Sequence, residues 1–457
     1  MIVKRKTSLL LFLLDACLVA LVFRIMGNLR GIEVFSSYPT TVLLLPLVFI
    51  VGALYLIDGY RPRTDMLSLD YASQHTIALL AAMVGTLLIT YAIITNTFPL
   101  QTSRLVIILS FVAYIPISLG YRRLIYHRNS LREKTKSIVF VGDQSSCQVF
   151  RDEARRSTLA QPIVFCLPTS SSEPVVMDDG TPLATIGEIL ARIESGSLEA
   201  EAIVLRESNR ELPPNVSQQL VRYYFRGTPT YTLELFYQVY LRKIPLYRLN
   251  QTWLFQEGFE IAREPVFERI KRISDVVLSI LGMIIFAPFI LLGGLAVWIE
   301  DRGPVFFRQT RIGRNHVPFQ IYKLRTMRTA TAASDPYTRV GDARITTVGR
   351  FLRTTRIDEL PQVWNVLKGD MSLICPRAEW DRLVAEYERQ IPCYHFRHLV
   401  KPGITGWAQV NYPYGAKIED TLRKLEYDLY YIRHFSFALD AAIVLKTIHV
   451  MLFGKGR

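Results

Sequence analysis

The chain has 457 residues, enough for two or three domains. Half of them are hydrophobic, and 54 lysines and arginines against 40 acidic residues give a formal net charge of +14. The five cysteines are scattered with no C-x-x-C pair, which argues against a zinc site or a disulfide framework and fits a reducing cytoplasm. A basic balance favours nucleic acid, an anionic membrane surface or a phosphorylated substrate, and the apolar segments that follow favour the last two.

Four apolar stretches occupy the first quarter of the chain, and each is near the roughly 20 residues that a membrane-spanning helix needs. They are Ser8–Met26, Thr40–Ile57, Thr76–Thr95 and Leu105–Leu119. The alternative is a set of buried helices in a large soluble core. We expect residues 1–125 to form a four-helix transmembrane domain rather than a cleavable signal peptide. Lysines and arginines concentrate before the first stretch, after the second and after the fourth, which places both ends of the bundle in the cytoplasm.

Asp15 lies within the first of these stretches. An acidic residue at membrane depth is either functional or makes a polar contact between helices. We expect the helix–helix contact.

The pattern changes near Lys136 to short apolar runs that alternate with polar helical stretches. The runs are Ser137–Val141, Ile163–Leu167 and Ala202–Leu205, and the helical stretches are about Ser145–Arg156 and Ile186–Ser195. This rhythm predicts a small α/β domain with a parallel sheet over residues 136–250. The first run ends in Gly142-Asp143, but the sequence that follows is not G-x-G-x-x-G, so a degenerate Rossmann-like domain is favoured over dinucleotide binding.

A fifth apolar stretch, residues 274–298, has Pro288 near its middle. A proline inside a helix removes a backbone donor and kinks the helix. An ordinary kinked spanning helix would put the remaining basic chain outside the cell. We therefore predict a re-entrant helix that enters the membrane, bends at Pro288 and returns to the same face, with the freed backbone groups satisfied within the protein. This helix would anchor an α/β catalytic domain, residues 263–457.

The C-terminal third carries cations between glycines and aromatics. Lys323 and Arg325 are two residues apart in an alternating stretch, so on a strand they would share one face, where two cations can hold a diphosphate. Farther along, Asp358 and Glu359 precede Pro361, a residue suited to a first helical turn.

The adjacent carboxylates allow two interpretations. Asp358 is either an ordinary N-cap with Glu359 favouring the helix dipole, or part of a phosphate site. Arg350, Arg353 and Arg356 lie immediately upstream and favour the phosphate site. A carboxylate there tolerates phosphate when Mg²⁺ bridges the two, and it can also attack phosphorus as a nucleophile.

Five motifs follow one another in the order GPVFFRQTRIG, IYKLRTM, IDELPQVWNVLKGDMSLICPR, VKPGITGWAQVN and LEYDLYYIRHFSFALD. Together they resemble the bacterial sugar transferase domain of the polyprenyl-phosphate hexose-1-phosphate transferases, the monotopic phosphoglycosyl transferases, over about Glu268 to Lys446. Four spans and a degenerate nucleotide fold in front resemble the large members that start exopolysaccharide or O-antigen synthesis.

The resemblance implies that a UDP-sugar and undecaprenyl phosphate give undecaprenyl-diphospho-sugar and UMP, with Mg²⁺, at the cytoplasmic face of the bacterial inner membrane. It implies that Asp358 attacks the β-phosphate and contacts the metal, and that Glu359 assists. Phosphates would be bound by Lys323, Arg325, Arg353 and Arg377. The partners would be the two substrates and inner-membrane lipids, not nucleic acid, and the middle domain is a candidate for homodimerisation.

Three positions depart from the family pattern: Ala287 replaces serine, Leu324 replaces phenylalanine, and Cys375 replaces a glycine in the loop that carries Arg377. An alternative enzyme is a membrane-anchored NAD-dependent sugar-nucleotide dehydratase or epimerase, but no tyrosine has a lysine four positions on. A non-catalytic scaffold is disfavoured by the intact Asp358-Glu359 pair and its arginines.

Overall fold

The structure is a computed structural model. It describes residues 2–31, 43–61, 64–93, 104–133, 136–157, 159, 161–168, 176–178, 180, 182–206, 214–246, 265–328, 342, 344–413, 415 and 417–453. The chain divides into two compact units, Met1–Arg242 and Lys243–Arg457.

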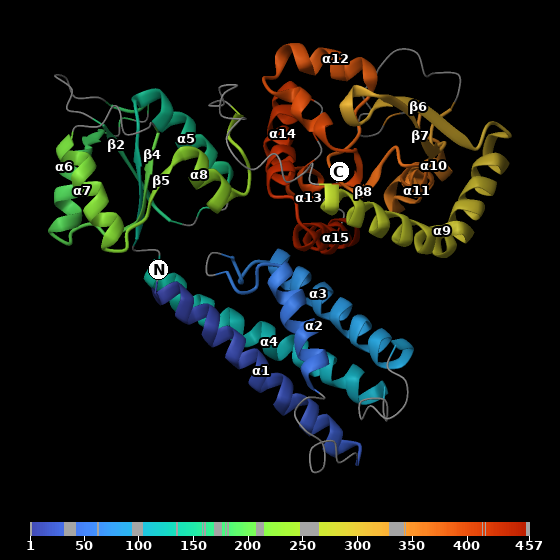
Figure 1. Cartoon of the computed structure of the whole chain (residues 1–457), viewed down its shortest axis with the longest axis horizontal. Helices are drawn as coiled ribbons and strands as arrows, with labels where there is room; N and C mark the ends of the chain where they lie inside the picture. Colours follow the sequence, from blue (N-terminus) through green and yellow to red (C-terminus); the bar gives the residue numbers. More distant parts are fainter. Residues whose placement is uncertain are drawn as a thin grey trace. The chain divides into compact units, whose positions relative to one another are not determined.

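The N-terminal unit begins with apolar helices (Figure 1). They are α1 (Ile2–Leu29), α2 (Leu44–Leu56), α3 (Leu69–Leu88), which continues into the π-helical turn η2 (Ile89–Ile93), and α4 (Arg104–Glu133). Among the described residues, α1, α3 and α4 contain segments long and apolar enough to span a membrane, whereas α2 has 13 residues. Thirteen residues reach only about 20 Å, against a hydrocarbon core of about 30 Å. Residues 40–42 of the second predicted stretch lie outside the described residues.

Asp15 is completely buried and links the helices, as the sequence predicted. Its carboxylate forms a buried ion pair with Arg122 and accepts hydrogen bonds from the hydroxyls of Tyr60, Tyr114 and Tyr121. A buried charge is tolerated only when it is paired and hydrogen-bonded. Arg122 is therefore part of the helix packing.

A parallel sheet follows in the same unit, as predicted, and it has five strands where the sequence indicated three apolar runs. Its strands are β1 (Ser137–Val141), β2 (Ile163–Leu167), β3 (Ala184–Thr185), β4 (Ala200–Leu205) and β5 (Thr230–Thr232), in the order β3-β2-β1-β4-β5. Its helical elements are α5 (Gln144–Arg156), α6 (Ile186–Glu194), α7 (Pro214–Phe225), α8 (Leu233–Phe236) and the π-helical turn η5 (Tyr237–Leu241). This is the doubly wound strand order of Rossmann folds.

Alternate residues of β1 face the two layers of the core. Ile138 and Phe140 pack on the side of α5 and α8, and Val139 and Val141 on the side of α6 and α7. Figure 1 shows these helix pairs on opposite faces of the sheet. Both faces are covered, which explains the uninterrupted apolar strands in the sequence.

An ion pair joins the carboxyl ends of the neighbouring strands β1 and β4. Asp143 follows β1 and pairs with Arg206, which follows β4. Open α/β sheets bind their ligands at this kind of topological switch point. In this domain a carboxylate and its arginine lie there, which agrees with the missing glycine fingerprint and disfavours dinucleotide binding.

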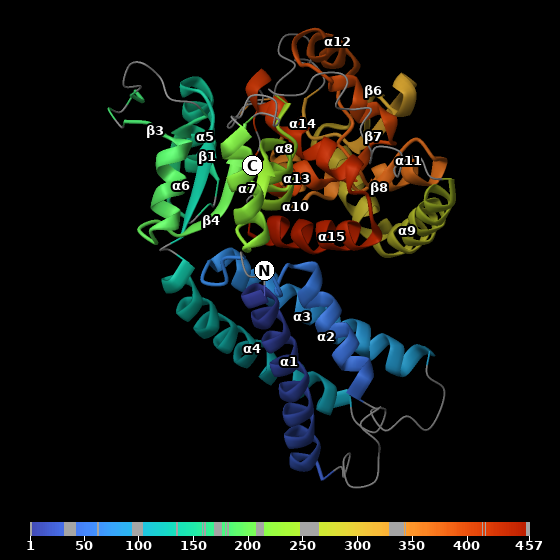
Figure 2. The same cartoon turned by 60° about the vertical axis from the view of Figure 1, so that its left-hand side comes forward.

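The C-terminal unit is a mixture of helices and short strands around one main core. Its elements are α9 (Pro265–Asp301), β6 (Phe306–Ile312), η9 (Arg314–His316), β7 (Pro318–Leu324), α10 (Thr347–Thr355), η11 (Ile357–Glu359), α11 (Gln362–Lys368), β8 (Ser372–Ile374), α12 (Asp381–Gln390), η12 (Tyr394–Leu399), β9 (Gly403–Thr405), α13 (Trp407–Asn411), α14 (Ile418–Arg433) and α15 (Phe437–Leu452). Strands β6 and β7 form an antiparallel hairpin, and β8 pairs with β9 in parallel. Figure 2 shows α15 beside α13 and β8. Ile244 and Leu246, which the sequence assigned to the middle domain, belong to the main core of this unit.

Helix α9 contains the predicted re-entrant segment and is bent (Figure 1). Its N-terminal part is fixed by an ion pair between Lys271 and Asp440 at 2.6 Å. Near its C-terminal end, Glu300 accepts hydrogen bonds from the first backbone N–H groups of α10. Between these ends the apolar side chains are exposed, for example Ile284 at 68% and Leu291 at 72%. Both ends of the helix therefore contact the same domain, while its middle presents a bare apolar surface.

Candidate active site

The adjacent carboxylates lie on a one-turn 3-10 helix, η11, between α10 and α11. Helix α10 ends at Arg356, whose left-handed backbone (φ +60°) redirects the chain into this turn. Helix α11 has Pro361 as its N-cap and no side-chain cap bond. The interpretation of Asp358 as an ordinary N-cap is therefore wrong, because the carboxylate lies a full turn before the cap position.

Glu359 is held by cations from three different segments. Its Oε1 lies 2.6 Å from Nζ of Lys323 and 3.0 Å from Nη2 of Arg377, and its Oε2 lies 3.8 Å from Nη1 of Arg356. Burial alone would raise the pKa of Glu359, but Lys323, Arg377 and Arg356 together hold that pKa well below its usual range. Glu359 is therefore an ionised anchor for cations.

Asp358 has a contrasting environment although it is the next residue. Its side chain is buried, with 8% of the residue exposed, and its Oδ1 has no hydrogen-bond partner among the described residues. Burial raises the pKa of Asp358 to about 6, and the charge of Glu359 adds to the increase, while Lys323 and Arg353 oppose it. A buried ionisable group with an unsatisfied oxygen is typical of a functional site.

The strand that supplies Lys323 is fixed to α11 by Asn365. The completely buried Asn365 side chain accepts a hydrogen bond from the backbone N–H of Tyr322 at 3.2 Å and donates one to the carbonyl of Gln320 at 2.6 Å. These two bonds set the register between β7 and the helix that follows the carboxylates. The sequence indicated no role for Asn365, because only the fold brings it beside the strand.

The structure separates Lys323 from Arg325. Strand β7 ends at Leu324, and the Arg325 guanidinium forms a bidentate ion pair with Asp301 and donates to the Pro304 carbonyl at 2.6 Å. A Cβ at Gly303 would lie 2.8 Å from Nη2 of Arg325, so the absence of a side chain at Gly303 makes room for this guanidinium. Arg325 thus links the C-terminal end of α9 to the β6–β7 hairpin. Its phosphate-binding role stays a prediction.

The other two predicted phosphate ligands are Arg353, which precedes the carboxylates in the sequence, and Arg377, which follows them. Arg353, on α10, donates from Nε to Oγ1 of Thr326 at 2.8 Å and lies near enough to Asp358 to lower its pKa. Arg377 follows β8, and its carbonyl accepts a hydrogen bond from the buried Arg397, which is paired with Asp428 at 3.0 Å. Arg397 and Asp428 therefore position the loop that carries Arg377.

The Cys375 departure from the family pattern is accommodated in this loop. Its side chain is buried in the main core, with Sγ 3.9 Å from the hydroxyl of Tyr431. The close backbone approaches fall on Gly403 and Gly406, where a Cβ would lie 2.2 Å and 2.3 Å from backbone atoms of Cys375. The loop needs glycine at those positions, while residue 375 has room for a side chain.

The fold and the site define a membrane-associated protein whose C-terminal unit gathers two unlike carboxylates among cations. The model of the family described as "Bacterial sugar transferase" matches residues 266–454. These residues contain α9 apart from its first residue, and every member of the site.

Three curated bacterial proteins are similar in sequence to this chain. One is the UDP-N-acetylgalactosamine-undecaprenyl-phosphate N-acetylgalactosaminephosphotransferase of Aeromonas hydrophila, 36% identical over 269 residues, which cover 59% of this chain and 63% of that protein. The UDP-glucose:undecaprenyl-phosphate glucose-1-phosphate transferase of Caulobacter vibrioides is 44% identical over 185 residues, 40% of this chain and 69% of that protein. The exopolysaccharide production protein PSS of Rhizobium leguminosarum is 38% identical over 195 residues, 41% of this chain and 98% of that protein. The chain belongs to the bacterial sugar transferase family.

Proposed function

We propose that the protein transfers a sugar-1-phosphate from a UDP-sugar to undecaprenyl phosphate, giving undecaprenyl-diphospho-sugar and UMP, as the first step of exopolysaccharide or O-antigen synthesis. The observation that carries this proposal is the contrast within the Asp358-Glu359 pair. One carboxylate is buried and has an oxygen without a hydrogen-bond partner in the described part of the chain, and its neighbour holds two cations at 2.6 and 3.0 Å. The names of the Aeromonas hydrophila and Caulobacter vibrioides relatives state transfers of this kind.

The reaction proceeds in two steps. A carboxylate oxygen of Asp358 attacks the β-phosphorus of the UDP-sugar, and the bond from that phosphorus to the bridging oxygen breaks, so that UMP leaves with the electron pair. A phosphate oxygen of undecaprenyl phosphate then attacks the same phosphorus. The acyl-phosphate bond breaks, the diphosphate product forms and the Asp358 carboxylate is restored.

The neighbouring residues bind the phosphates and favour the ionised form of Asp358. Glu359 holds Lys323 and Arg377 beside the nucleophile, where the two cations bind the phosphates whose charge shifts during the transfer. Arg353 lies near Asp358 and lowers its pKa, which favours the ionised nucleophile. We assign Arg325 to phosphate binding as well, after release from Asp301 when substrate is bound.

Oδ1 of Asp358 accepts no hydrogen bond from any residue that the structure describes, and it also fits a magnesium ion, because Mg²⁺ in proteins takes one or two carboxylates together with substrate phosphates. Asp358 would hold the ion. When bound, Mg²⁺ neutralises the diphosphate charge that would otherwise repel the carboxylate.

We further propose that α9 is re-entrant and that the catalytic unit lies on the cytoplasmic face of the inner membrane, where nucleotide sugars are found. A straight helix of 37 residues would be about 55 Å long and would carry its ends far apart. The contacts of Lys271 and Glu300 with one domain support a bend, and Pro288 is the proline inside the helix.

The topology is tested by a single cysteine at Leu291 in a protein whose exposed native Cys17 is replaced by serine. A re-entrant helix predicts that a membrane-impermeant thiol reagent added from the periplasmic side leaves position 291 unlabelled. A cysteine placed in the catalytic unit at the exposed Glu419 should label only after the membrane is opened. Efficient periplasmic labelling at either position would overturn the arrangement.

The reaction is tested by trapping the covalent intermediate. Protein incubated with a UDP-sugar carrying a labelled β-phosphate, without lipid acceptor, should retain label and release UMP, and added undecaprenyl phosphate should remove the label. The Asp358→Asn variant should retain none. UMP release that depends on the lipid acceptor, without any labelled protein, would refute the two-step route.

A further inference from the structure

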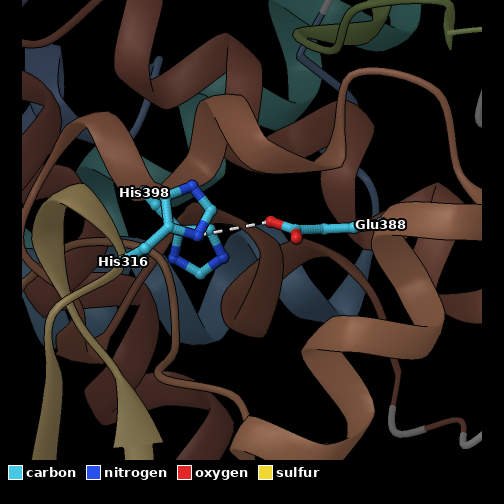
Figure 3. A group of neighbouring side chains, drawn as sticks. All are labelled: His316, Glu388 and His398. Atoms are coloured by element: carbon cyan, nitrogen blue, oxygen red, sulfur yellow. Dashed lines mark ion pairs between the residues drawn. The ribbon is translucent and has the colours of Figure 1, made fainter.

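A second group of chemically reactive side chains lies elsewhere in the C-terminal unit. His316 ends the turn between β6 and β7, Glu388 lies on α12, and His398 lies on η12 (Figure 3). One ligand atom from each of these residues falls within 4.8 Å of the others. None of the three belongs to the Asp358 site, and the Asp358 chemistry makes no use of them.

His398 is the member that most clearly lacks a partner. The residue is buried, with 6% exposed, and its Nε2 has no hydrogen-bond partner among the described residues. Its ring does make a hydrogen bond to the backbone of Gly313. Because Nε2 is unpartnered, that bond is made by Nδ1–H, and the Nε2 lone pair remains available. A histidine that donates one N–H to a backbone carbonyl and offers the other nitrogen has the arrangement of a metal ligand.

The other two side chains have a spacing that suits a small ion. Nδ1 of His316 lies 3.4 Å from Oε1 of Glu388. Two ligands bound to a tetrahedral Zn²⁺ at roughly 2.0–2.1 Å lie about 3.3 Å apart. All three ligand atoms lie within 4.8 Å of one another, so the widest pair must close by at most about 1.5 Å. His316 and Glu388 are both exposed, so core packing does not prevent this movement.

We propose that His316, Glu388 and His398 form a Zn²⁺ site with a fourth position open to water. Two imidazoles and one carboxylate are a common zinc ligand set, whereas Mg²⁺ prefers oxygen ligands. Such a site contains no cysteine, so the scattered cysteines of the sequence gave no indication of it.

The ion would connect the segments that carry two cations of the active site. The turn with His316 leads directly into β7, which carries Lys323, and His398 follows Arg397, which bonds the carbonyl of Arg377. Bound zinc would tie this turn to α12 and η12. The site would hold these segments together, and the proposal stands independently of the proposed transfer reaction.

The test uses the full-length protein in detergent after removal of metal with a chelator. Zn²⁺ is titrated in competition with a chromophoric chelator, and metal content is measured after desalting. We expect one tight equivalent of Zn²⁺, unaffected by millimolar Mg²⁺. His316→Ala and Glu388→Gln should each weaken binding by about 10–100-fold or more, since loss of a direct ligand costs at least as much as loss of an outer partner.

The matched control is His395→Ala, which changes an exposed histidine on the same η12 segment outside the cluster and should leave the affinity unchanged. Because both test variants change exposed residues, folding is checked by comparing their unfolding temperatures with that of the control in the absence of zinc. Absence of a tight equivalent in the unaltered protein would overturn the site and leave only a His316–Glu388 ion pair. Equal zinc binding by the control and both test variants would also overturn it.

Discussion

Two regions of the molecule place an aspartate beside arginine at a position where phosphate is often bound. They differ in how far the carboxylate is buried and in whether its oxygens are paired. In the α/β domain, Asp143 pairs with Arg206, and its side chain is 47% exposed. In the catalytic unit, Asp358 is buried, and one of its oxygens has no partner within the described ranges. The comparison shows that a carboxylate next to an arginine is not by itself a reactive site.

The physical difference is how the negative charge is balanced. A half-exposed pair is stabilised by solvent and by its own partner, and such a pair contributes about 0–1 kcal/mol. The charge of Asp358 has lost solvent, while the best-placed cations are bound by its neighbour Glu359. Asp358 is therefore poised to act on a ligand, and Asp143 is not.

The largest expected effect separates the two aspartates directly. Asp358→Asn removes the proposed nucleophile and should lower UMP release by about 10⁴-fold or more. Asp143→Asn should stay within about twofold of the unaltered protein. The measurement is UMP formed from a UDP-sugar and undecaprenyl phosphate, and comparable losses in both variants would break the comparison.

Glu359→Gln tests whether the neighbour acts by holding cations. The substitution keeps the shape of the side chain but releases Lys323 and Arg377 from a full negative charge. We expect kcat/KM to fall about 100-fold, while Glu419→Gln, at an exposed position on α14, has no effect. Activity equal to that of the control would show that the cations are placed without Glu359.

The dependence of activity on pH should follow Asp358. With a pKa of about 6 in the folded protein, the carboxylate is ionised near neutral pH and becomes protonated below about pH 6. kcat/KM should then fall about tenfold per pH unit on the acid side. In Glu359→Gln the acid limb should move to lower pH, because the charge of Glu359 raises the pKa of Asp358. An acid limb that is unchanged in this variant would contradict the coupling.

The smallest effect is on stability. Folding raises the pKa of Asp358 from 3.8 to about 6, so stability from this group is fully present below pH 3.8 and is lost as the pH rises through about 6. Near pH 7.5, Asp358→Asn should therefore raise the free energy of unfolding by as much as ~3 kcal/mol. The gain should shrink toward pH 4.5, as measured by thermal unfolding. Asp143→Asn, which changes a half-exposed side chain, should show no such gain, and a destabilised Asp358→Asn would contradict the buried charge.

Much of the fold could be predicted from local pattern. The apolar run Ser137–Val141 and its successors became parallel strands of a doubly wound sheet, because both faces of such a sheet are buried and require continuous apolar residues. The role of Asp15 as a polar contact between helices was also correct. The second apolar stretch was predicted to span the membrane, but its described helix, α2, has 13 residues and is shorter than a span.

The site could be predicted less completely. Spacing placed Lys323 and Arg325 on one strand face, but β7 ends between them, and Asp301 engages Arg325. Asp301 pairs with Arg325, and Lys323 pairs with Glu359. The partners in each pair are distant in sequence, so both pairs depend on how α9 and the hairpin pack in the folded unit. That packing is set by tertiary contacts and leaves no periodic signal in the chain.

The sequence by itself determined the apolar helices, the parallel sheet, the family and the pair of adjacent carboxylates, because each of these is written in local composition or in motifs. Only the tertiary structure decided that the two carboxylates are unlike. Glu359 is neutralised by Lys323 and Arg377 from separate segments, and Asp358 is buried without an equivalent partner among the residues that the structure describes. The physical reason is that burial and charge pairing depend on neighbours in space, and two residues adjacent in the chain can have different ones.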